Sequence, residues 1–280
     1  MTTSSLAVGS YSVQAAYSGD NIYGPSTSQM IAIAVGTSGA TPKVSSVVTT
    51  QGNQASQNST IAQNDWIEIH GTNLSQSIHD WSKEDFSNGL PTALAGVSAT
   101  VNGKPAAVSY VSPTQVNILT PLDNATGSVQ VQLVTPNGNT NIVTAGMSLA
   151  SPSFLALDQA GHVAARHADY SLAGPSALSV PGYTFSPVKP GEIVLLYAVG
   201  FGQTNPPITD QLKGLGPLPA PPTVTIGGIQ ATVLGEGLGS PGLYQLNVIV
   251  PQSAPNGDLA LSAVHDGVST QNGVVLTVQR

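Results

Sequence analysis

Four blocks of sequence occur twice in this chain, in the same order, and this internal repeat constrains the fold more than any other feature. The first set covers residues 66–71, 97–106, 110–121 and 127–134, and the second covers residues 193–197, 224–231, 242–251 and 257–264. The match is clearest where Gln115-Val116-Asn117 returns as Gln245-Leu246-Asn247. Matched blocks in a fixed order indicate repeated structural units. We therefore predict two homologous modules, with Ile67 equivalent to Val194, Val101 to Ile226 and Val116 to Leu246.

The composition indicates that both modules are built from strands. The 280 residues include 30 Gly and 21 Pro, and the repeat blocks alternate apolar residues with Thr, Ser, Asn and Gln. Short alternating segments separated by turn residues are typical of β-sandwiches. We expect an all-β fold of two tandem Ig-like β-sandwich modules, with an N-terminal partial Ig-like segment and a long connector.

The N-terminal segment is too short to form a sandwich by itself. Tyr11, Val13, Ala15 and Tyr17 alternate with polar residues and predict one face of a strand, and a second apolar run covers residues 30–35. An Ig-like sandwich needs about seven strands, and this segment offers two or three. The predicted organisation is a partial Ig-like repeat (1–36), a linker (37–63), module 1 (64–150), a connector (151–190) and module 2 (191–280).

Charge and cysteine content exclude several classes of protein. Only 8% of the residues are charged, against about 25% in an average domain, and the net charge is −7. Such a chain lacks the basic surface that binds nucleic acid. It has no cysteine, so disulfides and thiolate zinc sites are excluded. No apolar run approaches the 18 or so residues of a membrane span.

The N-terminus also lacks the basic and apolar regions of a secretory signal. The charge-poor surface is nevertheless typical of exported bacterial repeat modules. We therefore interpret the chain as the tail of a longer exported polypeptide.

Several short motifs carry a resemblance to known families. They are Gly71-Thr72-Asn73-Leu74, Val101-Asn102-Gly103, Ala164-Ala165-Arg166-His167-Ala168-Asp169, Pro190-Gly191-Glu192, Gly200-Phe201-Gly202 and Tyr244-Gln245-Leu246-Asn247. As a set, over residues 42–280, they resemble an uncharacterised family of C-terminal modules on large exported proteins, especially of acidobacteria. Each half is similar to the Ig-like, plexin and transcription factor (IPT/TIG) fold, and residues 9–28 resemble the last strands of a bacterial Ig-like repeat. The resemblance implies an extracellular or cell-surface location and no assigned activity.

No constellation in the sequence predicts an enzyme. There is no Gly-x-Ser-x-Gly motif to raise a nucleophilic serine. His162, His167 and Asp169 could in principle gather on a metal, but their spacing suits neither one helix face nor one strand face. We favour a connector held by hydrogen bonds from Arg166 and Asp169, and we expect no catalysis.

A charge-dense stretch between the first two repeat blocks supplies a candidate calcium site. Asp80, Glu84 and Asp85 offer carboxylate oxygens on one loop, which suits calcium. They lack the regular spacing of a calcium loop, so a solvated loop or one short helical turn is the favoured interpretation. We expect no cofactor, with calcium as the alternative.

The same stretch contains the candidate binding residues Trp81 and Phe86. Aromatic side chains on a loop can hold sugar faces or partner proteins, although a plug over one end of the sandwich is the favoured alternative. The repeated Gln-x-Asn pairs are expected to cap the backbone of a neighbouring loop.

Two functions remain open. The first is a non-enzymatic structural or adhesive module, a spacer, stalk or assembly subunit, whose partners are other protein chains and which can self-assemble by strand addition. The alternative is a carbohydrate- or protein-binding module that uses the Trp81 loop.

Overall fold

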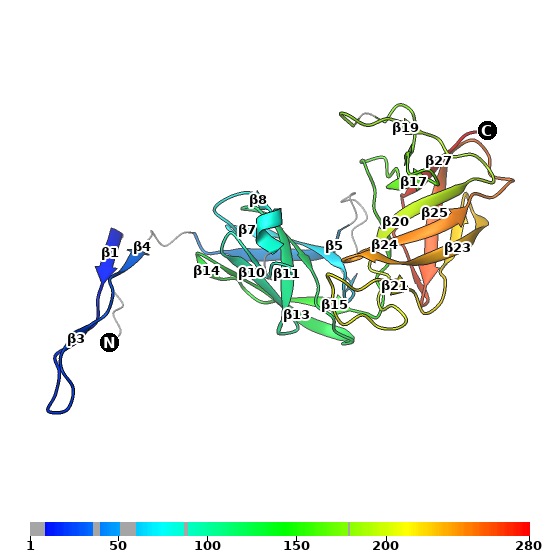
Figure 1. The fold of residues 1–280 in the computed structure, drawn as a ribbon. Coiled ribbons are helices and arrows are strands. Elements are labelled where there is room, and N and C mark those ends of the chain that lie inside the picture. Colours follow the sequence, from blue (N-terminus) through cyan, green and yellow to red (C-terminus); the bar gives the residue numbers. More distant parts are fainter. Residues whose placement is uncertain (1–8, 36–39, 51–59, 87–88, 179) are drawn as a thin grey trace. The chain divides into compact units, whose positions relative to one another are not determined.

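The computed structural model describes residues 9–35, 40–50, 60–86, 89–178 and 180–280, and their regular secondary structure consists of strands and one short 3₁₀ helix, η2 (Lys83–Phe86) (Figure 1). The chain divides into two compact units, residues 1–41 and residues 42–280. The larger unit contains two β-sandwich-like domains in tandem. The predicted all-β class with tandem sandwiches is confirmed.

The N-terminal unit is a hairpin ladder. Its strands are β1 (Gly9–Val13), β2 (Ala16–Tyr17), β3 (Ser26–Thr27) and β4 (Ile31–Val35), with β1 antiparallel to β4 and β2 antiparallel to β3. The carboxylate of Asp20 shapes the turn, because its Oδ1 accepts the N–H groups of Ile22 and Tyr23, both at 2.8 Å. Val13 and Tyr17 remain largely exposed.

The first sandwich is formed by eleven strands. They are β5 (Lys43–Thr49), β6 (Thr60–Ile61), β7 (Trp66–Thr72), β8 (His79–Asp80), β9 (Ala93–Leu94), β10 (Val97–Val101), β11 (Lys104–Val111), β12 (Gln115–Leu119), β13 (Gly127–Thr135), β14 (Gly138–Asn139) and β15 (Val143–Met147).

The second sandwich is formed by twelve strands. They are β16 (Ser153–Phe154), β17 (Ala165–His167), β18 (Leu172–Ala173), β19 (Phe185–Ser186), β20 (Ile193–Val199), β21 (Gly216–Pro217), β22 (Thr223–Ile226), β23 (Ile229–Ser240), β24 (Leu243–Ile249), β25 (Gly257–His265), β26 (Val268–Ser269) and β27 (Val275–Val278).

Strand order confirms the duplication. The path β7-β12-β11-β10-β13-β15 in the first sandwich is repeated as β20-β24-β23-β22-β25-β27 in the second. The register repeats too: Ile67 pairs with Ile118, and the equivalent Val194 pairs with Val248. The six residues predicted as equivalent lie in matching strands, and all are buried in the two cores.

A tight turn and a long strand recur in both copies and explain two of the sequence blocks. Asn102-Gly103 and Gly227-Gly228 each form a two-residue hairpin in which both residues have positive φ, between +52° and +75° for the first pair and +60° and +75° for the second. This is the backbone of a type I′ turn, which Asn and Gly adopt most readily. The strand that follows crosses between the two layers of its sandwich. β11 pairs first with β10 and then with β12, and β23 pairs first with β22 and then with β24.

Strands also occupy the segments that the sequence assigned to a linker and a connector. β5 lies within 37–63 and pairs with β7, and its inward-facing Val44 and Val47 belong to the first core. Within 151–190, β16 and β17 both pair with β20, and Phe154 belongs to the second core.

Specific contacts tie the two sandwiches together. The indole Nε1 of Trp66 donates to the carbonyl oxygen of Pro241 at 2.8 Å, and the amide of Gln211 donates to Asn64 Oδ1 at 2.9 Å and to the Thr120 carbonyl at 2.8 Å. Gly242 lies against Trp66 so closely that a Cβ there would be 2.7 Å from the indole. Real side chains do not approach so closely, so position 242 requires glycine. We call this interface between the two sandwiches, around Trp66, Pro241 and Gly242, the seam.

A buried carboxyl group lies beside the seam. Asp65 is fully buried; its Oδ2 accepts the Ala62 N–H at 3.3 Å, while its Oδ1 has no hydrogen-bond partner among the described residues. Burial raises the pKa of Asp65 well above its usual value, because the ionised form loses its hydration.

This raised pKa predicts a pH-dependent stability. The folded protein binds the Asp65 proton more tightly than the unfolded chain, so its stability falls as the pH rises from the unfolded pKa through the folded one. Asp65→Asn keeps an oxygen acceptor and removes the charge. At pH 4.5 the variant and the wild type should have similar free energies of unfolding. As the pH rises the variant should become the more stable of the two, by about 1–3 kcal/mol once the wild-type carboxyl is ionised. Parallel stability curves from pH 4.5 to 9 would contradict the assignment.

The N-terminal hairpin contributes no residue to either hydrophobic core as described, since both begin at or after Val44. Deleting residues 1–41 should therefore leave the thermal midpoint of the remaining chain within about 2 °C of the full-length value. Differential scanning calorimetry measures this directly. A drop of several degrees would show that the hairpin stabilises the sandwiches, and a change in solution mass would support the predicted strand addition.

Candidate functional site

The predicted binding residues Trp81 and Phe86 lie together at the edge of the first sandwich. Trp81 follows β8, and its backbone N–H donates to the carbonyl of Ser109 at 2.9 Å, which fixes the loop to β11. The Trp81 ring meets Trp66 edge-on at 5.4 Å and Phe86 at a tilt of 55° and 4.8 Å. Such aromatic pairs stabilise their arrangement by about 0.5–1.5 kcal/mol each, so the three rings form a fixed cluster.

This cluster lines a hollow of about 460 Å³, the junction cleft, whose walls come from both sandwiches. The described lining residues are Thr50, Trp66, Trp81, Phe86, Leu90, Leu155, Val199, Leu212, Ser240, Pro241 and Leu243. Trp81 packs against the first core, as a plug would, and all three rings present a surface to the cleft. This packing agrees with the interpretation of Trp81 as a plug, and its role in binding stays a prediction.

A second hollow adjoins the junction cleft and was missed by the sequence analysis. This tyrosine cavity, of about 550 Å³, shares Leu155 and Leu243 with the cleft. Its other described lining residues are Leu157, Ala164, Ala165, Arg166, Leu172, Val180, Tyr183, Phe185 and Tyr197. The sequence predicted only a hydrogen-bonding role for Arg166 in the connector, because other residues that line this cavity, such as Tyr197 and Leu243, are far away in the sequence.

The acidic loop holds its carboxylates by internal contacts. Asp85 Oδ2 accepts the N–H of Ser82 at 2.6 Å and the Ser82 hydroxyl at 2.9 Å, and these hydrogen bonds, the backbone one first, lower the pKa of Asp85. Asp80 lies on the exposed strand β8, paired with Tyr110, and the Glu84 side chain lies outside the described residues. Among the side chains that are described, no group of three His, Cys, Asp or Glu could hold a metal ion.

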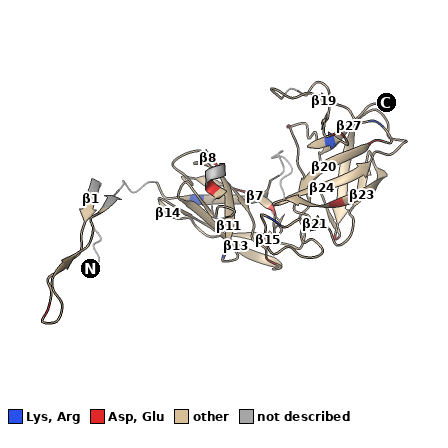
Figure 2. Ribbon diagram, viewed as in Figure 1, with Lys and Arg blue, Asp and Glu red and all other residues tan. Residues whose placement is uncertain are grey.

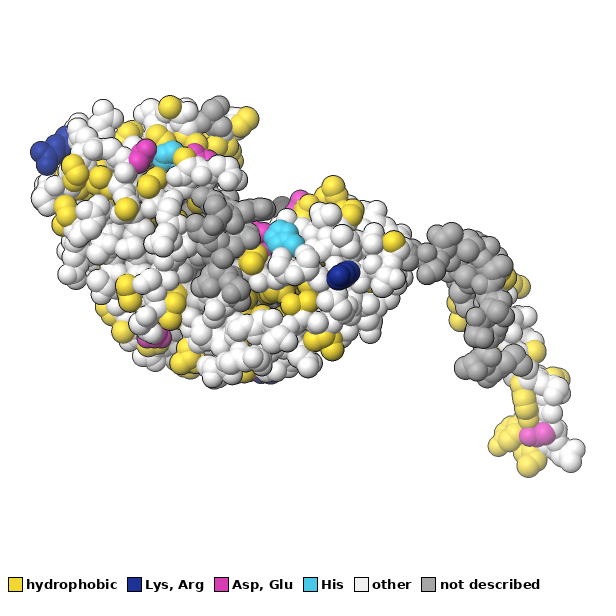
Figure 3. Space-filling view, turned by 180° about the vertical axis from the view of Figure 1, so that it is seen from behind, with side chains coloured by type: hydrophobic (Ala, Val, Ile, Leu, Met, Phe, Trp, Pro, Cys, Tyr) yellow, Lys and Arg dark blue, Asp and Glu magenta, His cyan; other side chains and the backbone are white. Residues whose placement is uncertain are grey.

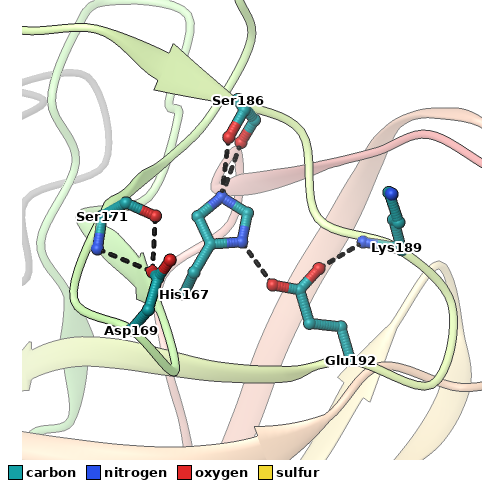
Figure 4. Close-up of polar contacts among 6 residues, drawn as sticks. All are labelled: His167, Asp169, Ser171, Ser186, Lys189 and Glu192. Carbon is teal, nitrogen blue, oxygen red and sulfur yellow. Dashed lines mark hydrogen bonds and ion pairs between the residues drawn. The ribbon is translucent and has the colours of Figure 1, made fainter.

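His167 is held on both ring nitrogens. Its Nδ1 contacts Glu192 Oε1, and its Nε2 lies 3.0 Å from the Ser186 hydroxyl and 3.1 Å from the Ser186 carbonyl (Figure 4). The other oxygen of Glu192 accepts the Lys189 N–H at 2.8 Å. The serine–histidine–carboxylate order resembles a hydrolase triad. However, the Ser186 carbonyl shares the same nitrogen, so the imidazole links β17 to Ser186 in β19 and to Glu192 just before β20, rather than serving the hydroxyl alone.

The three residues considered for a metal are not brought together. His162 contacts Asp158 at 2.7 Å and Asp258 at 3.5 Å, whereas Asp169 accepts hydrogen bonds from Ser171. Arg166 donates to the Tyr170 carbonyl at 3.3 Å. The expected role of Arg166 and Asp169 in holding the connector agrees with these contacts.

In each of the repeated Gln-x-Asn pairs, the glutamine contacts the asparagine of its own pair and not a neighbouring loop. Gln115 Nε2 donates to Asn117 Oδ1 at 2.8 Å, and Gln245 Nε2 donates to Asn247 Oδ1 at the same distance. The expectation was that these amides cap the backbone of a neighbouring loop. Residues two apart on a strand lie on the same face, so each glutamine reaches its own asparagine instead. Their recurrence is therefore structural.

Comparison with known families identifies the first sandwich. Residues 42–150 match the model described as "IPT/TIG domain". The first sandwich is an IPT/TIG domain. The match begins at β5, in agreement with the pairing of that strand, and ends before β16. No curated protein matches the chain by sequence.

Solved structures similar to the chain are distant. The surface glycan-binding protein PbSGBP-B from Prevotella bryantii is 12% identical, with 85% of this chain and 42% of that one covered and a TM-score of 0.25. SGBP-B of the Bacteroides ovatus mixed-linkage glucan utilization locus, in complex with a heptasaccharide, is 10% identical, with 98% and 54% covered and a TM-score of 0.32. The plexin A4 extracellular region is 11% identical, with 88% and 19% covered and a TM-score of 0.28. The chain therefore spans about half or less of each of these proteins.

Hydropathy adds one observation on the described residues: none of their helices combines the length and apolar character needed to cross a bilayer.

The acidic loop gives a prediction for metal removal. Because Asp85 is occupied by Ser82 and Asp80 lies apart on β8, we expect EDTA to leave the thermal midpoint unchanged, and calcium to do the same. Thermal melts in 1 mM EDTA and in millimolar calcium measure this. A calcium-dependent rise of several degrees, lost in Asp80→Asn, would contradict it, since a bound ion stabilises the folded state by mass action.

Proposed function

We propose that this protein is a non-enzymatic binding module of an exported or cell-surface protein, and that it holds a carbohydrate chain in the junction cleft. The observation that carries the proposal is the cluster of Trp66, Trp81 and Phe86 on the wall of a hollow between two sandwiches.

The chemistry of the cleft suits a sugar ring. A pyranose presents one face of C–H groups, and the negative π face of an aromatic ring attracts these hydrogens while excluding water. Ligand sites are typically apolar hollows with a few polar groups at the rim, and about 460 Å³ lies within their usual range of 300–1,000 Å³. PbSGBP-B is named as a surface glycan-binding protein, but its TM-score of 0.25, like the 0.32 of the Bacteroides ovatus SGBP-B, is too low to support the proposal.

The cleft is also preorganised. Trp66 is fixed by its hydrogen bond to Pro241, and Gln211 fixes the loop that carries Leu212 to the first sandwich. A ligand that enters therefore does not have to order the walls, and the binding free energy is not reduced by that cost.

A structural role is the second candidate, and the same seam favours it. Hydrogen bonds and a close glycine contact across the two sandwiches would make the pair a stiff spacer within a longer chain. Strand addition to another chain would use backbone N–H and C=O groups at an edge of the N-terminal hairpin, and it would cover the exposed apolar side chains there.

Binding to a panel of β-linked and α-linked oligosaccharides, followed by calorimetry on the best ligand, tests the proposal. Trp81→Ala should weaken binding at least tenfold, about 1.4 kcal/mol, because it removes the central ring. Tyr23→Ala, which removes an exposed aromatic side chain from the hairpin, is the matched control and should bind normally.

Since Trp81 also packs on the first core, the thermal midpoint of each variant is recorded, and Leu212→Ala provides a second test at a lining residue contributed by the second sandwich. Failure of the wild type to bind any glycan would reject the proposal, as would full binding by a folded Trp81→Ala variant.

A further inference from the structure

The tyrosine cavity contains a cation without an acidic partner. Arg166 lines it, and no ion pair among the described residues involves Arg166. Its one hydrogen bond, from a guanidinium nitrogen to the Tyr170 carbonyl at 3.3 Å, leaves other donors of the guanidinium group unused. Basic side chains are sparse in the whole chain, which has 7 Lys and Arg in 280 residues (Figure 2).

The other walls of this cavity provide apolar surface and hydroxyl groups. Tyr183 and Tyr197 line it beside Phe185, and neither tyrosine hydroxyl has a hydrogen-bond partner within the described part of the chain. No carboxylate is among the described lining residues, so the only formal charge of the cavity is that of Arg166. On a protein of net charge −7, this hollow is a local positive site.

The cavity adjoins the junction cleft. Leu155 and Leu243 belong to both linings, so the cavity that Tyr183 lines is the immediate neighbour of the hollow that Trp81 lines. Charged side chains are few on the face of the molecule that Figure 3 shows. An elongated ligand would then meet aromatic surface at one end and a guanidinium group at the other.

We infer that the tyrosine cavity is an acidic-sugar subsite, which binds the carboxylate of a uronic acid residue in an oligosaccharide that also occupies the junction cleft. The planar guanidinium of Arg166 pairs with the carboxylate, in the geometry that arginine favours for such groups. Tyr183 and Tyr197 contact the ring and its hydroxyls. This inference rests on the proposed function and names the class of its ligand.

The test compares a homogeneous oligogalacturonate with its methyl ester, which removes the charge of each carboxylate and adds one methyl group, measured by calorimetry with the full-length protein. We expect the free acid to bind at least tenfold more tightly at low salt, with the preference decreasing as salt is added. Arg166→Met, which keeps an unbranched side chain, should remove this preference, so that the variant binds the acid and the ester with affinities within about twofold of each other. Lys43→Met removes an exposed cation from β5 and should retain the preference.

The outcomes separate the two proposals. Equal binding of acid and ester by the wild type, or a preference that persists in Arg166→Met, would overturn the acidic subsite while leaving glycan binding intact. Binding of neither ligand, together with no binding across the glycan panel, would reject the proposed function and this subsite with it. Because Arg166 and Tyr183 are both exposed, substitutions there should leave the fold intact. Tyr183→Phe, which removes only the hydroxyl, should weaken the binding of the acid and of the ester alike.

Discussion

The contact between Trp66 and the Pro241–Gly242 turn is the interaction on which the candidate site depends. A hydrogen bond of 2.8 Å from the indole to Pro241 and the close fit of Gly242 set the second sandwich against the first at one point. The same indole then contacts Trp81 and faces the junction cleft. One side chain thus joins the two sandwiches and forms a wall of the hollow between them, so stability of the seam and shape of the site are coupled.

Polar groups support this seam at a cost. Asp65 and Asn64 are buried beside it, and Asp65 Oδ1 and Asn64 Nδ2 lack partners among the described residues. An unpaired buried polar atom costs about 1–3 kcal/mol. The neighbouring contacts from Gln211 and Thr120 offset part of that cost, since they satisfy Asn64 Oδ1 and the Asp65 N–H. The burial that raises the pKa of Asp65 is therefore a consequence of packing two sandwiches together.

Local patterns predicted the parts of the structure that depend on local rules. The turn at Asn102-Gly103 and the alternation in residues 97–101 specify a hairpin from a few adjacent residues, and both occur as expected. The clustering of Trp81 with Phe86 was also within reach, because they are five residues apart. The tyrosine cavity was not, since Arg166 and Tyr197 meet only through the pairing of β17 with β20 and the packing of the connector. Short strands such as β16 lack a repeat of the alternating pattern, and their pairing partners decide their structure.

The repeat itself explains why the two hollows are not duplicated. Trp81, Phe86, Arg166 and Tyr183 all lie outside the four matched blocks, in the segments that separate the blocks or the two copies. Where a matched strand does contribute, the residue differs: the register places Trp66 opposite Leu119 at the position of Ile193 in the second copy, and Tyr197 at the position of His70 in the first. The shared strands build two similar sandwiches, and the divergent loops and these two exchanged side chains create a groove that only the pair can form. Loops on a stable scaffold are where binding residues concentrate, and in this chain the scaffold is a duplicated one whose asymmetry provides the site.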